Sequence, residues 1–312
     1  MDASRQRSIS VLRPEELQEL ALLYRQIASD LSVVREDAAS KQLATYLNRL
    51  LGRAHNLIYM GRRASPGGIR TFYKDTFPAV FRETFSDTFA AFTIFLAAAA
   101  VGALLGIADP SFLRHFLGPQ MMETIEQHKM WTDSIVTIKP LASSAILTNN
   151  LSVSFATFAL GITAGVGTIY MMLLNGLLIG VIGSACWREG MSLSLWSFVA
   201  GHGVLELPAI FIAGGAGLGI ARGLLFPGHL PRRLSLVIAG SRSVRLVLGT
   251  IPLLIIAGLV EGFISPSGIS PALKFLLAGV LTALLILYLN KKPSSAAALS
   301  AVPATGNSGG LK

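Results

Sequence analysis

Residues 140–187 read PLASSAILTNNLSVSFATFALGITAGVGTIYMMLLNGLLIGVIGSACW, a stretch of 48 residues that contains no charged side chain. A membrane-spanning α-helix needs about 20 consecutive apolar residues, so this stretch is too long for one span. Its length suits two spans joined by a tight turn. We therefore predict a helical hairpin that crosses a lipid bilayer twice.

The composition of the whole chain agrees with a membrane protein. Of its 312 residues, 52% are hydrophobic and 14% are charged, whereas soluble domains contain about 25% charged residues. An ordinary soluble globular protein is therefore excluded. The single cysteine, Cys186, also excludes a disulfide scaffold and a four-cysteine zinc site.

Further apolar windows extend outward from the hairpin. From about Thr88 they reach the length of a membrane-spanning helix. The predicted spans cover residues 88–107, 146–168, 170–187, 204–225, 246–264 and 272–290. We expect an all-α fold, a polytopic transmembrane helical bundle of about six spans that occupies residues 88–292. A short re-entrant helix within 188–203 would change the number of spans.

The first 87 residues have a different character. They hold 13 of the 26 Lys and Arg residues and 10 of the 17 acidic residues, as a soluble helical domain does. Apolar residues recur every three or four positions from Leu17 to Val34 and again from Leu43 to Leu57, which indicates two amphipathic helices. We expect residues 1–87 to form a cytoplasmic helical domain. The tail at 293–312 is rich in Pro, Ser and Ala and is expected to be disordered.

An aromatic run joins these two regions. Phenylalanines recur at every fourth position from Phe77 to Phe89, so their rings share one helix face. The run suits a helix at the lipid headgroups, and packing against the first two helices explains it equally well.

The basic residues predict the orientation in the membrane. With the N-terminus inside, the inner segments together with Arg222 hold 21 basic residues and the outer segments hold 5. Cytoplasmic loops are rich in Lys and Arg, so we expect a multi-pass protein of the plasma (inner) membrane with both termini in the cytoplasm. The net charge of +9 then records topology and contact with membrane lipids, and nucleic acid is excluded as a partner.

Polar residues within the apolar spans need an explanation, because ionisable groups are costly in a bilayer. His202 and Glu206 are four residues apart and share one helix face. The topology places them, and Glu261, near the outer ends of their spans. We expect one buried polar cluster, open toward the outside, formed by Asn149, Asn150, His202, Glu206 and Glu261. Asn175 lies toward the inner side, and we expect it to bond to backbone within the hairpin.

Three interpretations of the cluster remain open. One His and two Glu suit a divalent metal ion such as zinc, although the chain has no HExxH motif. Membrane carboxylates also form proton relays and ion paths. The third interpretation is a structural network that fixes helix register through interhelical hydrogen bonds. We favour the third, which expects no metal; if a metal binds, its candidate ligands are His202, Glu206 and Glu261.

The sequence favours a protein that is not an enzyme. Ser184 is not part of a nucleophile elbow, and the spans contain no second histidine beside His202. No P-loop or dinucleotide-binding fingerprint occurs between a strand and a helix. We expect no catalytic residues and no cofactor. The 37-residue outer loop, 108–144, is long enough to contact a partner.

Several motifs occur together in an order typical of one family. They are Asn149-Asn150, Asn175-Gly176, the segment HGVLELPA from His202, residues 213–228 and the segment AGLVEGFISP from Ala257. Over roughly residues 70–290 the chain resembles the stage II sporulation protein M family of bacterial and archaeal membrane proteins. The resemblance implies a polytopic plasma-membrane protein that acts as anchor and scaffold, in a family with no established catalytic activity. In endospore formers it implies work in engulfment, in a complex with a peptidoglycan-degrading amidase and a lytic transglycosylase.

Together these observations predict an anchor or scaffold for envelope or cell-wall remodelling proteins. We expect its partners to be membrane lipids and membrane or extracytoplasmic (periplasmic) proteins, including peptidoglycan hydrolases; a homo-oligomer is also compatible with the sequence. Sporulation belongs to the family's role and is not assured for this chain. The alternative is a metal-dependent intramembrane hydrolase or an ion-coupled transporter that uses His202, Glu206 and Glu261.

Overall fold

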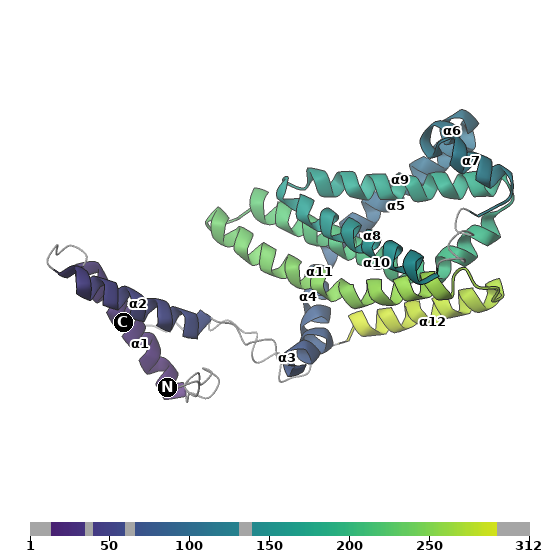
Figure 1. The fold of residues 1–312 in the computed structure, drawn as a ribbon. Helices are drawn as coiled ribbons and strands as arrows, with labels where there is room; N and C mark the ends of the chain where they lie inside the picture. The colour runs from purple at the N-terminus through teal and green to yellow at the C-terminus, as the bar shows by residue number, and fades with distance from the viewer. Residues whose placement is uncertain (1–13, 35–39, 60–65, 131–138, 292–312) are drawn as a thin grey trace, which may run out of the picture. The chain divides into compact units, whose positions relative to one another are not determined.

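The computed structural model describes residues 14–34, 40–59, 66–130 and 139–291. Within these residues all regular secondary structure is helical (Figure 1), so the predicted all-α fold class is confirmed. The chain divides into two compact units, Met1–Thr71 and Phe72–Lys312. The tail 293–312, for which the sequence predicts disorder, lies outside the described residues.

The first unit contains two helices where the N-terminal apolar pattern predicts them. They are α1, Pro14–Val34, and α2, Lys41–Tyr59, and they contact each other. Leu31, part of the first apolar stripe, is buried. A short third helix, α3, Pro66–Thr71, begins at a proline, whose missing N–H suits the first turn of a helix.

The second unit begins at Phe72, earlier than residue 88, where the sequence places the start of the membrane domain. A π-helical turn at Phe72–Thr76 leads into α4, Phe77–Glu83. Phe77 is fully buried, and its ring lies against that of Tyr288 with centroids 6.0 Å apart. The aromatic run therefore begins inside the core of the second unit.

Two tyrosine side chains form hydrogen bonds between this region and helices that come much later in the chain. The Tyr288 hydroxyl donates a hydrogen bond to the carbonyl of Tyr73 at 2.7 Å. The Tyr73 hydroxyl in turn donates to the carbonyl of Leu248 at 3.1 Å. These long-range bonds place residues 72–83 with the membrane bundle, although their charge resembles that of the N-terminal region.

Five described helices are long and apolar enough to cross a membrane, by length and composition. They are α5, Phe85–Ala108; α9, Val166–Arg188; α10, Ser192–Leu225; α11, Arg232–Phe263; and α12, Pro271–Leu289. Helix α10 is central, since it contacts α5, α9, α11 and α12 (Figure 1). The protein is a polytopic membrane bundle, as the sequence predicts.

Helix α8, Lys139–Ala159, lies where the sequence predicts the second span, but it is not one of these five. Its sequence is rich in Ser, Thr and Asn, which lowers its hydropathy. The predicted bounds, 146–168, are wrong, because a 3₁₀ turn at Leu160–Ile162 follows α8 directly. Ala164 and Gly165 then take left-handed conformations, with φ of 55° and 86°, which a continuing α-helix does not allow.

Helix α8 nevertheless packs into the bundle against α10 and α11. Its Ser154 and Thr157 side chains are fully buried. The hydroxyl of Thr168 on α9 donates to the carbonyl of Thr157 at 2.7 Å, so the two arms of the hairpin are bonded together. Buried hydroxyls at helix contacts are common in membrane bundles, and they explain why this helix is less apolar than its neighbours.

Helices α10 and α11 are longer than predicted. At 34 and 32 residues and about 1.5 Å per residue, each exceeds the ~30 Å apolar layer of a bilayer. Helix α10 includes residues 192–203, where the sequence allows a separate re-entrant helix, and it continues through Pro208. The predicted spans 204–225 and 246–264 leave a connection of 20 residues, whereas the structure has one of six, at 226–231, and the basic residues that follow it lie on α11.

Glycines allow the closest helix contacts. On α9, a Cβ at Gly176 or Gly180 would overlap backbone atoms of α5, at Phe95 and Ala99 respectively. From the other side, a Cβ at Gly102 of α5 would lie 2.5 Å from the carbonyl oxygen of Leu177. Such contacts let two helix backbones approach directly, as small residues do in membrane bundles.

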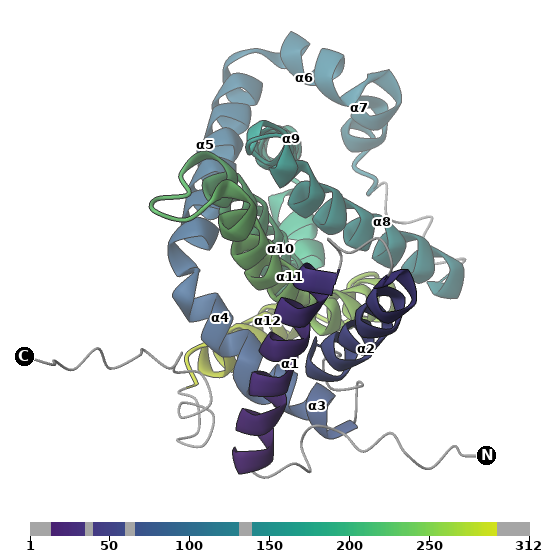
Figure 2. The same ribbon diagram turned by 90° about the vertical axis from the view of Figure 1, so that its left-hand side faces the viewer.

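The loop between α5 and α8 folds into two short helices, α6, Pro110–Leu117, and α7, Pro119–Glu126. They follow the end of α5 and pack against α9 (Figure 2). Leu113 and Ile125 are buried in a core shared with Val181 and other residues of α9 and α10. The expected outer loop thus contains a pair of helices with an apolar inner face.

Candidate functional site

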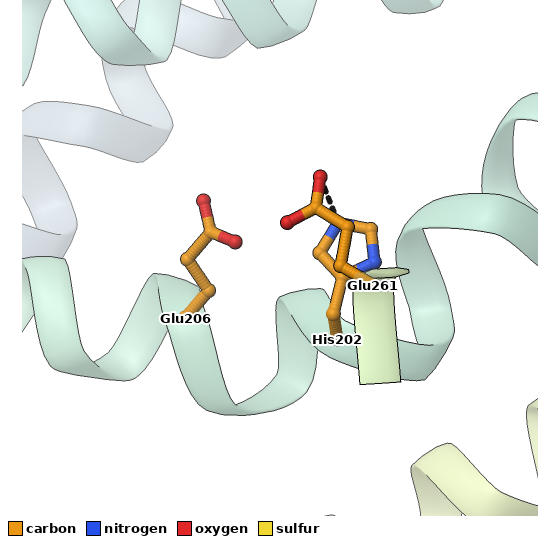
Figure 3. A group of neighbouring side chains, drawn as sticks. All are labelled: His202, Glu206 and Glu261. Carbon is orange, nitrogen blue, oxygen red and sulfur yellow. Dashed lines mark ion pairs between the residues drawn. The ribbon is translucent and has the colours of Figure 1, made fainter. Parts of the chain in front are cut away.

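The site is formed where α10 and α11 run side by side. His202 and Glu206 are one turn apart on α10 and project from the same face of that helix (Figure 3). Glu261 lies in the last turn of α11 and points toward both of them (Figure 3). The long contact between the two helices holds the three side chains together.

The three ionisable groups are close enough to share one small ligand. One nitrogen of His202 and one oxygen each of Glu206 and Glu261 lie within 4.8 Å of one another. His202 Nε2 is 3.8 Å from Glu261 Oε1, and the two side chains are only 8% and 13% exposed. A separation of 3.8 Å is too long for a hydrogen bond, so these groups face each other without a direct bond.

Two carboxylate oxygens in the cluster lack a partner among the residues that the structure describes. Glu206 Oε2 and Glu261 Oε2 are buried and accept no hydrogen bond from any described residue. Burying a carboxylate oxygen without a donor is costly. The cluster is therefore chemically incomplete as a purely internal network, and it suits an additional proton, water molecule or cation between the carboxylates.

The other nitrogen of His202 is occupied. His202 Nδ1 lies 3.0 Å from the hydroxyl of Ser265, just beyond the end of α11. The carbonyl of Ser265 accepts a 2.6 Å hydrogen bond from Nζ of Lys274 on α12. If Nδ1 carries the proton and donates to Ser265, then Nε2 presents its lone pair to the carboxylates. Ser265 and Lys274 thus orient the imidazole through two successive contacts.

The asparagines of the predicted cluster lie on α8. Asn150 is buried and Asn149 is exposed. Nδ2 of Asn149 donates to Oδ1 of Asn150 at 3.3 Å. Among the described residues, neither of them hydrogen-bonds to the cluster. Asn175 donates to the carbonyl of Met171 on its own helix at 2.7 Å, which is a backbone bond within the hairpin.

Sequence reasoning found the three ionisable members of the site and missed the residues that orient them. Ser265 is part of a quoted motif, but nothing in its spacing indicates that its hydroxyl reaches His202. Lys274 looks like an ordinary basic residue at a helix start, yet it is buried and bonds to Ser265. Its position four residues into an apolar helix is the one signal that could have singled it out.

These observations define a class of protein: a polytopic, all-helical integral membrane protein with a buried His–Glu–Glu cluster between two long helices. The family model described as Stage II sporulation protein M matches residues 91–266, more than half of the chain, and this range contains the whole cluster. The chain belongs to this family, which confirms the resemblance seen in the sequence.

Two further comparisons add to this result. A model described as a domain of unknown function matches residues 2–60, so the first unit is similar to a separate domain. An uncharacterized protein of Methanocaldococcus jannaschii is 29% identical over 134 residues, which cover 39% of this chain and 70% of that protein. No solved structure matches the chain.

Proposed function

We propose that this membrane protein is an anchor and scaffold for proteins that remodel the envelope or the cell wall. Membership of the Stage II sporulation protein M family supports this proposal. The five apolar helices supply the anchor. The partners are membrane or extracytoplasmic proteins, including peptidoglycan hydrolases, and the membrane is the plasma membrane with both chain termini in the cytoplasm.

The observation that carries the proposal is the folded pair α6–α7. It lies outside the apolar helices, yet its inner face, which includes Leu113 and Ile125, is buried against α9 and α10. An ion pair of 2.6 Å between Arg114 and Glu126 joins the two short helices. A rigid surface fixed to a membrane bundle is what a scaffold needs to present to a partner.

The experiment is affinity purification from native membranes followed by mass spectrometry. The test variant is Glu123→Lys, which reverses an exposed charge on α7. The matched control is Arg232→Glu, which reverses an exposed charge at the start of α11. We expect Glu123→Lys to reduce the recovery of envelope-remodelling enzymes while Arg232→Glu retains them. Equal recovery with both variants, or no such enzyme with the wild type, contradicts the proposal.

A second candidate function follows from the His202–Glu206–Glu261 cluster. Three potential ligand atoms within 4.8 Å and two buried, unpartnered carboxylate oxygens favour a bound cation. One His and two carboxylates match the ligand types that zinc and similar divalent ions accept. A metal-dependent intramembrane hydrolase or an ion-coupled transporter would use such a site.

The metal content of the purified protein separates the two candidates. Stoichiometric zinc that is lost in Glu206→Ala and Glu261→Ala, but kept in Glu123→Gln, supports the cation site and contradicts a purely structural cluster. Zinc-free protein in which His202→Ala changes only partner recovery contradicts the hydrolase. In that case the cluster fixes the register of α10 against α11.

A further inference from the structure

A second polar site lies far along α10 from the histidine. A cavity of about 230 Å³ opens between the start of α5, the last turns of α10 and the first turns of α11. A water molecule occupies about 30 Å³ of liquid, and pockets for drug-sized ligands begin near 300 Å³. The cavity therefore has room for a group the size of a lipid headgroup.

Gly219 on α10 leaves part of this space open. Gly215, Gly219 and Gly223 line the cavity at four-residue spacing, so they share one face of the helix. A Cβ at Gly219 would meet only Ser243 Oγ at 3.4 Å and Asp87 Oδ2 at 3.6 Å. Alanine fits there, whereas a longer side chain would project into the cavity.

The charged lining is positive overall. Arg222 and Arg242 line the cavity together with a single acidic residue, Asp87. Arg222 Nη2 and Asp87 Oδ2 form a 2.8 Å ion pair, in which Asp87 is only 11% exposed. This pair holds the guanidinium of Arg222 at the cavity, and no described residue accepts a hydrogen bond from its other N–H groups.

Among the described residues, Arg242 has no counter-ion. It is exposed and makes no hydrogen bond or ion pair with any described residue. Thr84, Ser235 and Ser243 also line the cavity. Their hydroxyls already donate to backbone carbonyls, so the arginines supply the hydrogen-bond donors. Guanidinium groups are typical partners of phosphate oxygens, which arginine binds in a bidentate manner.

Apolar side chains complete the lining. Phe226, Leu230 and Ile238 line the same cavity, and Phe226 is 75% exposed. A free inorganic anion gains nothing from apolar contacts. A phospholipid places its phosphate next to acyl chains, so it matches both parts of the lining.

We propose that this cavity binds the phosphate group of an anionic phospholipid headgroup, with Arg242 and Arg222 as donors and Asp87 as the residue that positions Arg222. The site lies where α10 ends and α11 begins, and Arg232 and Arg233 lie in the first turn of α11. Basic residues at the membrane surface draw anionic lipids toward the cavity. The site goes beyond the scaffold function and is independent of it.

The test is native mass spectrometry of the full-length protein released from phosphatidylcholine nanodiscs that contain phosphatidylglycerol. We expect one retained phosphatidylglycerol per chain. Its apparent affinity should fall about tenfold in Arg242→Gln, as expected for the loss of a charge-assisted hydrogen bond. Gly219→Leu should lower it at least as much by filling the cavity. The matched control, Arg245→Gln, removes a neighbouring exposed arginine and should retain the lipid.

Competition with inorganic phosphate distinguishes the source of the phosphate group. Retention of phosphatidylglycerol in millimolar phosphate supports the lipid, and displacement supports the same phosphate site with a soluble ligand. Equal lipid retention in wild type and Gly219→Leu overturns the proposal. An equal loss of lipid affinity in Arg245→Gln and Arg242→Gln also overturns it. Lipid binding would then come from the positive charge of the whole surface and not from the cavity.

Discussion

At the scale of single residues, His202 is held by contacts from several elements. Its Nδ1 lies 3.0 Å from Ser265, its ring meets Phe198 edge to face at 5.4 Å, and its Nε2 faces Glu261. A side chain constrained in this way has little freedom to rotate toward other groups. The imidazole therefore presents one nitrogen to the two carboxylates, whichever occupant completes the cluster.

The sequence predicts the members of this cluster better than their surroundings. The i, i+4 spacing of His202 and Glu206 fixes their common helix face, and the rarity of acids in apolar spans makes Glu261 conspicuous. Ser265 could not be predicted, because its position depends on how the chain turns after α11 ends at Phe263. Helix periodicity contains no information about such a turn.

A pH-dependent helix cap is expected at Asp109, just after α5. The hydroxyl and the amide of Ser111 donate to Asp109 Oδ1 at 2.7 and 2.8 Å, which lowers the pKa of the Asp109 carboxyl below its ordinary value of 3.8. Because the folded pKa is the lower one, the cap stabilises α6 above pH 3.8, and this contribution is lost as the pH falls through the folded pKa.

Hydrogen-exchange protection factors of the α6 amides measure this effect. We expect protection to fall in Asp109→Ala at neutral pH, because the N-cap acceptor is removed. Asp109→Asn is the control, since asparagine also caps helices but does not titrate. A wild type whose α6 protection drops on acidification no more than that of Asp109→Asn would show that the carboxylate is not responsible.

At the scale of helices, the contact between α5 and α9 depends on glycine. Gly180→Ala would place a Cβ against the carbonyl of Ala99, which is backbone and cannot rotate away. We expect a loss of about 1–3 kcal/mol in the free energy of unfolding, as for overpacked sites. Gly183→Ala is the matched control on the same helix, because its nearest neighbour is Trp196 at 3.4 Å.

Unfolding in detergent, followed by circular dichroism, compares the two variants. The expected result is a lower midpoint for Gly180→Ala and a midpoint near that of the wild type for Gly183→Ala. Equal midpoints in both variants contradict a direct backbone contact between α5 and α9.

Hydropathy predicts the apolar helices well and places their ends poorly. It finds α5, α9 and α12 nearly at their observed bounds. It misplaces the end of α8, because the left-handed residues Ala164 and Gly165 set that end. It also predicts spans that are too short for α10 and α11. The first turns of both helices are polar enough to resemble loops, yet they are helical.

At the scale of the whole molecule, the number of membrane crossings decides where the ends of the chain lie. Five apolar helices alone would place the two termini on opposite sides. With α8 as a sixth crossing, both termini share one side, as the distribution of basic residues predicts. The 21 residues of α8 span about 32 Å, long enough to cross.

Cysteine labelling tests this topology. Cys186 is the single cysteine of the chain, so Cys186→Ser gives a cysteine-free background. We expect Gln120→Cys on α7 to react with an impermeant maleimide in intact cells, and His229→Cys between α10 and α11 to react only after permeabilisation. The reverse pattern would invert the proposed orientation, and equal external labelling of both positions contradicts it.

Composition predicts the class of the molecule, while its units depend on specific contacts. A low charged fraction identifies the membrane bundle, and the charge-rich first 87 residues suggest a separate region. The compact units divide at Thr71 and Phe72 because the ring of Phe77 is buried with Tyr288 and against Gly249. Contacts between residues more than 170 positions apart in the sequence cannot be derived from the local charge.

The scaffold function is tested most directly by photocrosslinking in living cells, with p-benzoylphenylalanine at position 120 on the exposed side of α7 and, as a control, at exposed position 229. The account predicts covalent adducts between position 120 and an extracytoplasmic envelope-remodelling protein, and none of these adducts from position 229. Adducts from position 120 only to lipid or to another copy of this chain would contradict the scaffold function.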